Sequence, residues 1–205
     1  MIRSLDITTA SPRAAAPRRL IHSSDFRDFA GLWPTGDRSS DARFYAFQSA
    51  EMIELRLDTV IAARGGEPHF VAVLDNGDRP QALMAFAIER ERYSRFAPNA
   101  AILRFLDGGL ADYNAPVLYP CAAHWDAATQ HSVWRAILRI LPPVDFAVLE
   151  KMPDRIVDLP NPFHILSQYK FGVSGHGATL PEDWREFAAR LPNRKNWKAG
   201  RFRAL

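Results

Sequence analysis

The sequence predicts an α/β fold in which a mixed, largely antiparallel sheet is flanked by helices. Three observations carry this prediction. Amphipathic helical patterns run over residues 44–63 and 125–141. Between them, two apolar runs surround the dipeptide Asn76-Gly77, which is typical of an antiparallel hairpin. A further apolar run over residues 145–149 predicts a buried, central strand.

The chain begins with residues 1–20, which are rich in Arg, Ser and Ala and contain two prolines, so we expect a disordered arm. Next, Ser24-Asp25-Phe26 can cap a short helix. The helix over residues 44–63 is predicted from apolar side chains at helical spacing, and Gly65-Gly66 ends it.

The hairpin strands are expected at residues 69–74 and 81–88, followed by strands at 100–106 and 116–119. The second long helix ends at Pro142-Pro143. Short helices at 161–168 and 181–191 are expected to surround a strand or turn at 170–178, and residues 192–205 to form a basic helix or tail.

Composition excludes several classes of protein. The chain has 205 residues and a formal net charge of +3, and its basic residues gather near the two ends. A solvated or partner-facing basic helix at the C-terminus is therefore favoured over a nucleic-acid site. The only cysteine, Cys121, cannot form an intrachain disulfide, and no apolar run approaches the ~20 residues that cross a bilayer. We expect a cytoplasmic protein without membrane contact.

Metal and hydrolase motifs are missing from the sequence. The six histidines include no His-x-x-x-His pair, and a single cysteine rules out a zinc cluster, so we expect no metal. No Gly-x-Ser-x-Gly elbow and no Walker phosphate loop occurs. The glycines of residues 172–177, including Gly175 and Gly177, can bring backbone N–H groups to a pyrophosphate, or can simply form a flexible turn.

The loop over residues 105–119 is the most informative segment. It carries Gly108-Gly109 and four side chains that can hold an amine, a hydroxyl or a sugar: Asp107, Asp112, Tyr113 and Asn114. Ordered loops between strands often carry function. The same residues can instead satisfy the backbone of a turn, with the glycines supplying positive φ, and the sequence favours this second interpretation without excluding the first.

Over residues 25–205, several short motifs occur in the same order as in a known protein family. They are Phe47-Gln48-Ser49, Glu89-Arg90, the loop residues 106–116, the segment 146–153 with Asn161-Pro162, and Trp184 before the basic run 194–203. Together they resemble the CelD/BcsL type of GNAT-fold acyltransferase, a family described as cellulose-biosynthesis or BioF-like acetyltransferases. The resemblance implies a GNAT-like domain over residues 21–191.

The resemblance also implies a chemistry, for which the residues of this sequence offer candidates. Acyl-CoA, such as acetyl-CoA, would donate the acyl group to a small-molecule amine or saccharide acceptor. Asp112, Tyr113 or Glu89 would position or deprotonate the amine, Asp107 and Asn114 would bind the acceptor, and Gly175 and Gly177 would contact the cofactor.

Members of this family are usually longer than this chain and carry a second GNAT-like half, which is expected to hold acyl-CoA. We therefore expect this chain to correspond to the first half, with a surface for self-association or for docking to a second half. The alternative is a non-catalytic, degenerate GNAT-like domain that binds a partner or a saccharide. The resemblance leaves open whether the chain alone is active.

Overall fold

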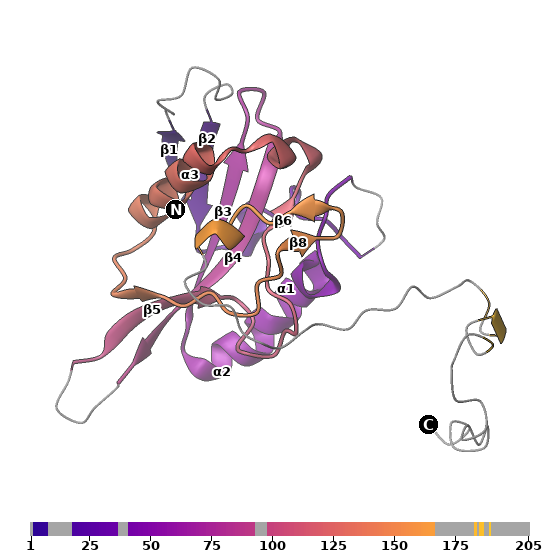
Figure 1. The fold of residues 1–205 in the computed structure, drawn as a ribbon. Coiled ribbons are helices and arrows are strands. Elements are labelled where there is room, and N and C mark those ends of the chain that lie inside the picture. The colour runs from indigo at the N-terminus through magenta and orange to yellow at the C-terminus, as the bar shows by residue number, and fades with distance from the viewer. Residues whose placement is uncertain are drawn as a thin grey trace, which may run out of the picture. The chain divides into compact units, whose positions relative to one another are not determined.

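A mixed, largely antiparallel sheet forms the centre of the fold (Figure 1). Its strands follow the order β1-β2-β3-β4-β5-β7, and a short strand, β6, also pairs with β4. Among the strands of the described residues, only β5 and β7 run parallel. The strands are β1 (Arg3–Ile7), β2 (Arg18–Ser23), β3 (Glu67–Leu74), β4 (Pro80–Glu91), β5 (Ala100–Phe105), β6 (Val117–Leu118) and β7 (Phe146–Ala147). The predicted α/β class and the predicted sheet type are confirmed.

The computed structural model describes residues 2–7, 18–36, 41–92 and 98–166, together with residues 183, 185, 186 and 189. The chain divides into two units, residues 1–167 and 168–205, and every element named here belongs to the first. The strand or turn at 170–178 and the basic segment 192–205 that we expected lie outside the described residues, as does most of the expected helix at 181–191.

A helical segment, interrupted at the extended Ser49, covers one face of the sheet. It consists of η2 (Ala46–Gln48), α1 (Ala50–Arg56), the π-helical turn η3 (Leu57–Ile61) and α2 (Ala62–Arg64). Ser49 caps α1 by accepting a hydrogen bond from the Met52 amide, and Gly65 ends the helix with a φ of 70°. This segment agrees with the helix predicted at residues 44–63.

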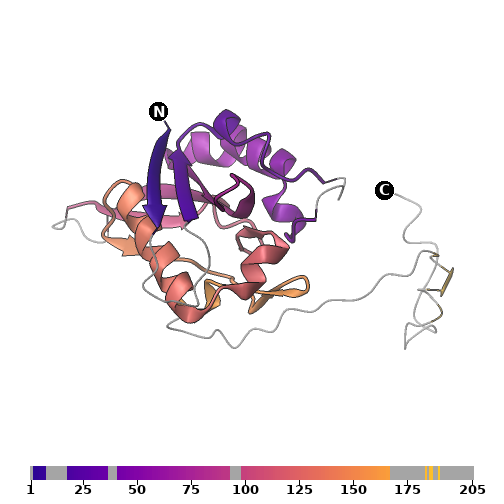
Figure 2. The ribbon, with the colours of Figure 1, turned by 90° about the horizontal axis from the view of Figure 1, so that it is seen from above.

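The helix α3 (Ala127–Ile140) lies on the opposite side of the sheet (Figure 2). Its buried residues, which include Val133 and Ile137, pack against Leu20, Val71 and Met84 of the sheet. A second apolar cluster on the other face joins Ile53 and Ile61 to Phe70, Ala72 and Leu83. The protein therefore has one apolar layer on each side of the sheet, as alternating strand side chains require.

The hairpin at Asn76-Gly77 is confirmed, since β3 and β4 pair in antiparallel register around it. The short cap at Asp25 is also confirmed, because its carboxylate accepts from the Arg27 amide at the start of η1 (Phe26–Asp28). The remaining elements are η4 (Pro120–His124), the hairpin of β8 (Arg155–Ile156) and β9 (Leu159–Pro160), and η5 (His164–Leu166).

Two expectations were wrong. The described part of the expected disordered arm forms strands, because Arg3–Ile7 pairs with Arg18–Ser23 and so adds an edge to the sheet. The alternation of Leu5 and Ile7 with polar residues is the signal that the arginine-rich composition obscured. The strand expected to be central, β7, is instead short and exposed, with Phe146 55% exposed. A continuous apolar run does not distinguish an edge from a centre.

In the part of the chain that the structure describes, no helix has the length and apolar character needed to span a membrane.

Candidate functional site

The 105–119 loop connects two strands, β5 and β6, that pair with different parts of β4. β3 occupies one edge of β4, so β5 and β6 must both pair along the other edge, at Phe86–Glu91 and at Ala82 and Leu83 respectively. The chain therefore leaves the sheet after Phe105 and returns at Val117. The residues between these points form a loop that begins and ends on one rigid strand.

The inner side of the loop is a buried hydrogen-bonded pair, Asp107 and Asn114. Asn114 donates from Nδ2 to Oδ2 of Asp107 at 2.8 Å, and the Gly109 amide donates to Oδ1 at 3.0 Å. Asp107 is 7% exposed and Asn114 is 4% exposed. The two residues expected to bind the acceptor are thus brought together, but they contact each other and stabilise the turn.

Arg56 of α1 lies beneath this inner side. Its Nη1 donates to the carbonyl oxygens of Phe47 at 2.8 Å and Leu106 at 3.4 Å. Burial lowers the pKa of the Arg56 guanidinium, and the nearby negative charge of Asp107 opposes this shift. Gln48 adds a third connection, from Nε2 to the Tyr113 carbonyl at 2.9 Å. The loop is therefore fastened to the helical segment by side chains near the Phe47-Gln48-Ser49 motif.

Gly108 permits the closest approach between loop and helix. Its φ is 57°, and a Cβ atom at this position would lie 2.2 Å from Cγ1 of Val60. Both the backbone conformation and the space require glycine. On the far side, Lys151 donates from Nζ to the carbonyls of Gly109 at 3.1 Å and Ala111 at 2.8 Å. These contacts hold the loop on two sides.

The outer side of the loop consists of Asp112, Tyr113 and the neighbouring Tyr45. Asp112 is exposed, and Tyr113 is half-buried. The Tyr113 ring stacks on Tyr45, with ring centroids 5.0 Å apart and an interplanar angle of 23°. Tyr45 donates from its hydroxyl to the Arg155 carbonyl at 2.8 Å, and burial raises its pKa. An exposed carboxylate beside aromatic rings can hold an ammonium group or the face of a sugar.

Glu89 belongs to a different cluster. Its carboxylate lies 3.4 Å from Nε of Arg104, which also pairs with Glu91 at 2.8 Å and approaches Glu150 at 4.0 Å. In the described part of the chain, no hydrogen bond or ion pair joins Glu89 to Asp112 or Tyr113. The three residues expected to act on the amine are therefore not brought together by such contacts.

The N-terminus of α3 is occupied by the protein's own carboxylate. Asp126 accepts from the Thr129 amide at Oδ1, at 2.8 Å. A phosphate at this helix end would meet a negative charge in place of free N–H groups. Gly175 and Gly177, the residues expected to contact acyl-CoA, lie outside the described residues.

Cys121 is exposed as a residue, but partial burial of its thiol raises the pKa of that group. A raised pKa reduces the thiolate population and is the opposite of nucleophile activation. Across residues 2–7, 18–36, 41–92 and 98–166, no three His, Cys, Asp or Glu side chains cluster closely enough to hold a metal ion.

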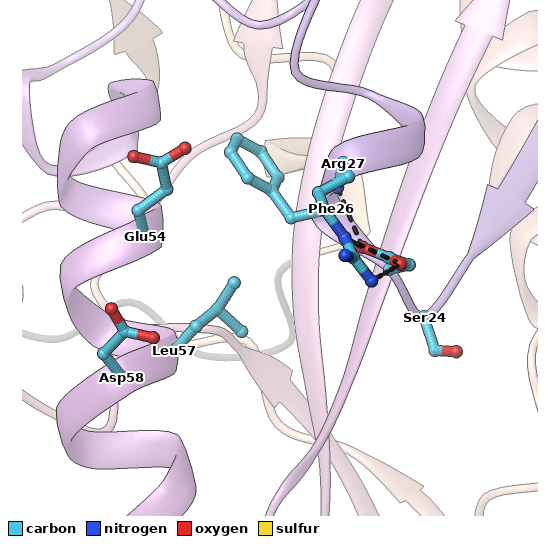
Figure 3. Close-up of a pocket in the computed structure, with 7 residues that line it drawn as sticks. Ser24, Phe26, Arg27, Glu54, Leu57 and Asp58 are labelled. Atoms are coloured by element: carbon cyan, nitrogen blue, oxygen red, sulfur yellow. Dashed lines mark hydrogen bonds and ion pairs between the residues drawn. The ribbon is translucent and has the colours of Figure 1, made fainter.

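A surface depression of about 470 Å³ lies between η1 and the α1–η3 helix (Figure 3). Phe26 and Leu57 provide its apolar lining, and Glu54 and Asp58 project from successive turns of the helix. On its other side, Arg27 pairs with Asp25 at 2.6 Å. None of the residues expected to bind acceptor or cofactor lines this depression.

Sequence reasoning missed the side chains that hold the loop, chiefly Tyr45, Gln48, Arg56 and Lys151. Three of these flank or belong to the Phe47-Gln48-Ser49 motif, but their contacts with the loop join residues 50 or more positions apart. No local pattern in the sequence reports such contacts.

Comparison with known protein families finds no match to this sequence, and comparison with curated proteins finds none either. Among solved structures, a crystal structure of the mutant F44R BH1408 protein from Bacillus halodurans overlaps with a TM-score of 0.37. The identity is 7%, over 76% of this chain and 84% of that chain. An overlap this low does not establish a shared fold.

Proposed function

We propose that this chain takes part in acyl-CoA-dependent N-acyl transfer, as a GNAT-like domain that holds the acceptor on the outer side of the 105–119 loop. The observation that carries the proposal is the exposed Asp112, which directly precedes Tyr113 in the chain, together with the stacking of the Tyr113 ring on Tyr45. A carboxylate attracts the ammonium form of an amine, and the rings supply a flat surface for an aliphatic chain or a sugar.

The arrangement of elements supports the GNAT-like part of the proposal. A helical segment precedes the antiparallel strands β3, β4 and β5, and α3 then connects β5 to its parallel neighbour β7. This order of helix, antiparallel strands, helix and strand is the one that the sequence patterns predict, and it is compatible with a GNAT-like domain.

In such a transfer, the neutral amine nitrogen attacks the thioester carbonyl. A C–N bond forms, the C–S bond breaks, and the proton lost by the nitrogen ends on the released thiol. The outer side of the loop would bind and orient the amine, with Asp112 accepting its N–H bonds and Tyr113 packing against its carbon atoms. Acyl-CoA binding, with roles for Gly175 and Gly177, stays a prediction, as does a cytoplasmic location.

A second candidate is a non-catalytic GNAT-like domain that binds a saccharide or a partner. The buried pair of Asp107 and Asn114 favours it, since two of the expected site residues serve the loop itself. The N-terminus of α3 favours it as well, because the Asp126 carboxylate accepts there the N–H bond that a bound phosphate would otherwise accept. The two candidates share acceptor binding and differ in acyl transfer.

Isothermal titration of the full chain tests both candidates. Glucosamine and ethanolamine serve as acceptor probes, and acetyl-CoA and a longer acyl-CoA serve as donors. We expect acceptor binding that falls about tenfold in Asp112→Asn and in Tyr113→Ala, because each removes one part of the surface. Asp58→Asn, an exposed carboxylate on the helical segment, is the matched control and should leave the affinity unchanged.

The donor titrations then separate the candidates. Binding of acyl-CoA, with thiol release that depends on the acceptor, supports acyl transfer by this chain. Acceptor binding without any acyl-CoA binding removes the enzymatic interpretation of the chain and leaves the non-catalytic domain. No acceptor binding, or equal binding by all three variants, contradicts the proposal for the loop.

A further inference from the structure

Two buried histidines on neighbouring strands form a cluster outside the proposed acceptor surface. His22 of β2 and His69 of β3 are 5% and 4% exposed. Their rings meet through Nε2 of His22 and Nδ1 of His69, 3.0 Å apart, with ring centroids at 5.2 Å. His22 is two residues from Leu20, and His69 is two residues from Val71. Leu20 and Val71 both belong to the core on the α3 face. Strand alternation therefore places both histidines on that face.

The hydrogen bond between the rings accounts for one nitrogen of each. Nδ1 of His22 and Nε2 of His69 are buried and have no hydrogen-bond partner. In the neutral pair one ring donates and the other accepts, so one outer nitrogen is an unpaired N–H and the other an unpaired acceptor. An added proton would turn the acceptor into a second unpaired donor and place a positive charge in the core.

The charges that face the pair offer little compensation. Arg3 of β1 is directly opposite His22 in the strand register and opposes a second positive charge. Glu67, two residues before His69, favours the charged form of that ring but is itself exposed. On β4 the residue opposite His69 is Phe86, and the α3 residues Arg135 and Arg139 point outward to solvent.

We propose that the His22–His69 pair is an acid-sensitive clasp on the sheet, which holds β2 against β3 while both rings are neutral and releases the β1–β2 edge when the pair takes up a proton. The proton is the ligand, and its binding position is whichever outer nitrogen, Nδ1 of His22 or Nε2 of His69, carries no hydrogen in the neutral pair. This inference does not depend on the acceptor surface or on acyl transfer.

The direction of the pH dependence follows from the shifts of the two rings. Burial, followed by the neighbouring His69 and Arg3, lowers the pKa of His22 to about 4. Burial also lowers the pKa of His69. The unfolded chain binds the proton near the ordinary value of ~6.5. Between these values the unfolded state carries more protons than the folded state. The contribution of the neutral rings to the free energy of unfolding is therefore fully present above pH ~6.5 and is lost as the pH drops toward 4.

Urea unfolding of the full chain at pH 7, 6 and 5 tests the clasp. For His22 alone, the unfolding equilibrium constant should rise roughly 20-fold between pH 7 and 5. The variant with His22→Phe and His69→Phe should lose most of this rise, because neither ring can then take up a proton. His131→Gln, an exposed histidine of α3, is the matched control and should keep it.

Two measurements on the unmodified chain keep the inference testable if the double variant does not fold. The NMR ring-proton resonances of both histidines should titrate well below the ordinary histidine pKa. Hydrogen exchange, corrected for intrinsic rates, should show acid-dependent opening at β1 and β2 before the amides of β4. A flat stability profile from pH 7 to 5, ordinary titration of both rings, or equal opening across the sheet would overturn the clasp.

Discussion

Asn114 donates a hydrogen bond of 2.8 Å to Asp107 inside the 105–119 loop, and both side chains are buried. This pair divides the loop into an inner side that holds the fold and an outer side, at Asp112 and Tyr113, that faces solvent. The division determines which substitutions should affect stability and which should affect binding.

The first prediction concerns the buried pair itself. Asp107→Ala leaves the Asn114 amide and the Gly109 N–H without their acceptor, so the free energy of unfolding should fall by about 1–3 kcal/mol. The double variant Asp107→Ala/Asn114→Ala should cost less than the sum of the two single variants, because it leaves neither member of the Asp107–Asn114 hydrogen bond unpaired. Urea unfolding of the two single variants and the double variant measures this coupling.

The control for that cycle is Asp112→Asn on the exposed side of the same loop, which should leave stability nearly unchanged. Additive effects of Asp107→Ala and Asn114→Ala would show that the two side chains do not act as a pair.

The second prediction concerns Gly108 and Gly109, which differ in their surroundings but share positive φ. Gly108→Ala places a Cβ atom 2.2 Å from Val60, so it combines steric overlap with backbone strain. Gly109→Ala meets no atom within 4 Å and carries only the backbone strain of about 1–2 kcal/mol. Thermal unfolding should therefore show a clearly larger loss for Gly108→Ala.

Val60→Ala provides the test of cause. Combined with Gly108→Ala, it should recover part of the lost stability, since it removes the methyl group that the new Cβ would strike. Equal losses for the two glycine substitutions would contradict the close approach of loop and helix.

The third prediction concerns the reactivity of Cys121. Burial raises the pKa of its thiol, so the thiolate is scarcer at neutral pH than in a free cysteine. Alkylation by iodoacetamide at pH 7 should be slower in the folded chain than in the urea-unfolded chain. The same comparison for a Cys121→Ser variant gives the background. Faster reaction in the folded state would instead indicate an activated nucleophile.

The sequence predicts the local features of the fold well. The hairpin at Asn76-Gly77, the helix ending at Gly65 and α3 each depend on residues close together in the chain. Burial and strand position depend on pairing across the sheet. The alternation of Leu5 and Ile7 signals a strand, but the sequence does not show that β1 pairs with β2 or that β7 lies at an exposed edge.

The candidate site also has some features that the sequence predicts and others that it does not. The sequence identifies the loop and the possibility that its Asp and Asn residues satisfy a turn, and Asp107 and Asn114 do so. It does not reveal the ring contact between Tyr113 and Tyr45, which lie 68 positions apart. Likewise, the sequence does not reveal that Glu89, a residue expected to act on the amine, is ion-paired with Arg104 across β4 and β5.

NMR mapping of acceptor binding tests the central claim most directly. On titration of the full chain with glucosamine, we expect the amide and ring resonances of Asp112, Tyr113 and Tyr45 to shift together with one dissociation constant. Resonances around Glu54 and Asp58, at the surface depression, should stay in place. Shifts confined to that depression, or no shifts at the loop at saturating glucosamine, would contradict an acceptor surface on the outer side of the 105–119 loop.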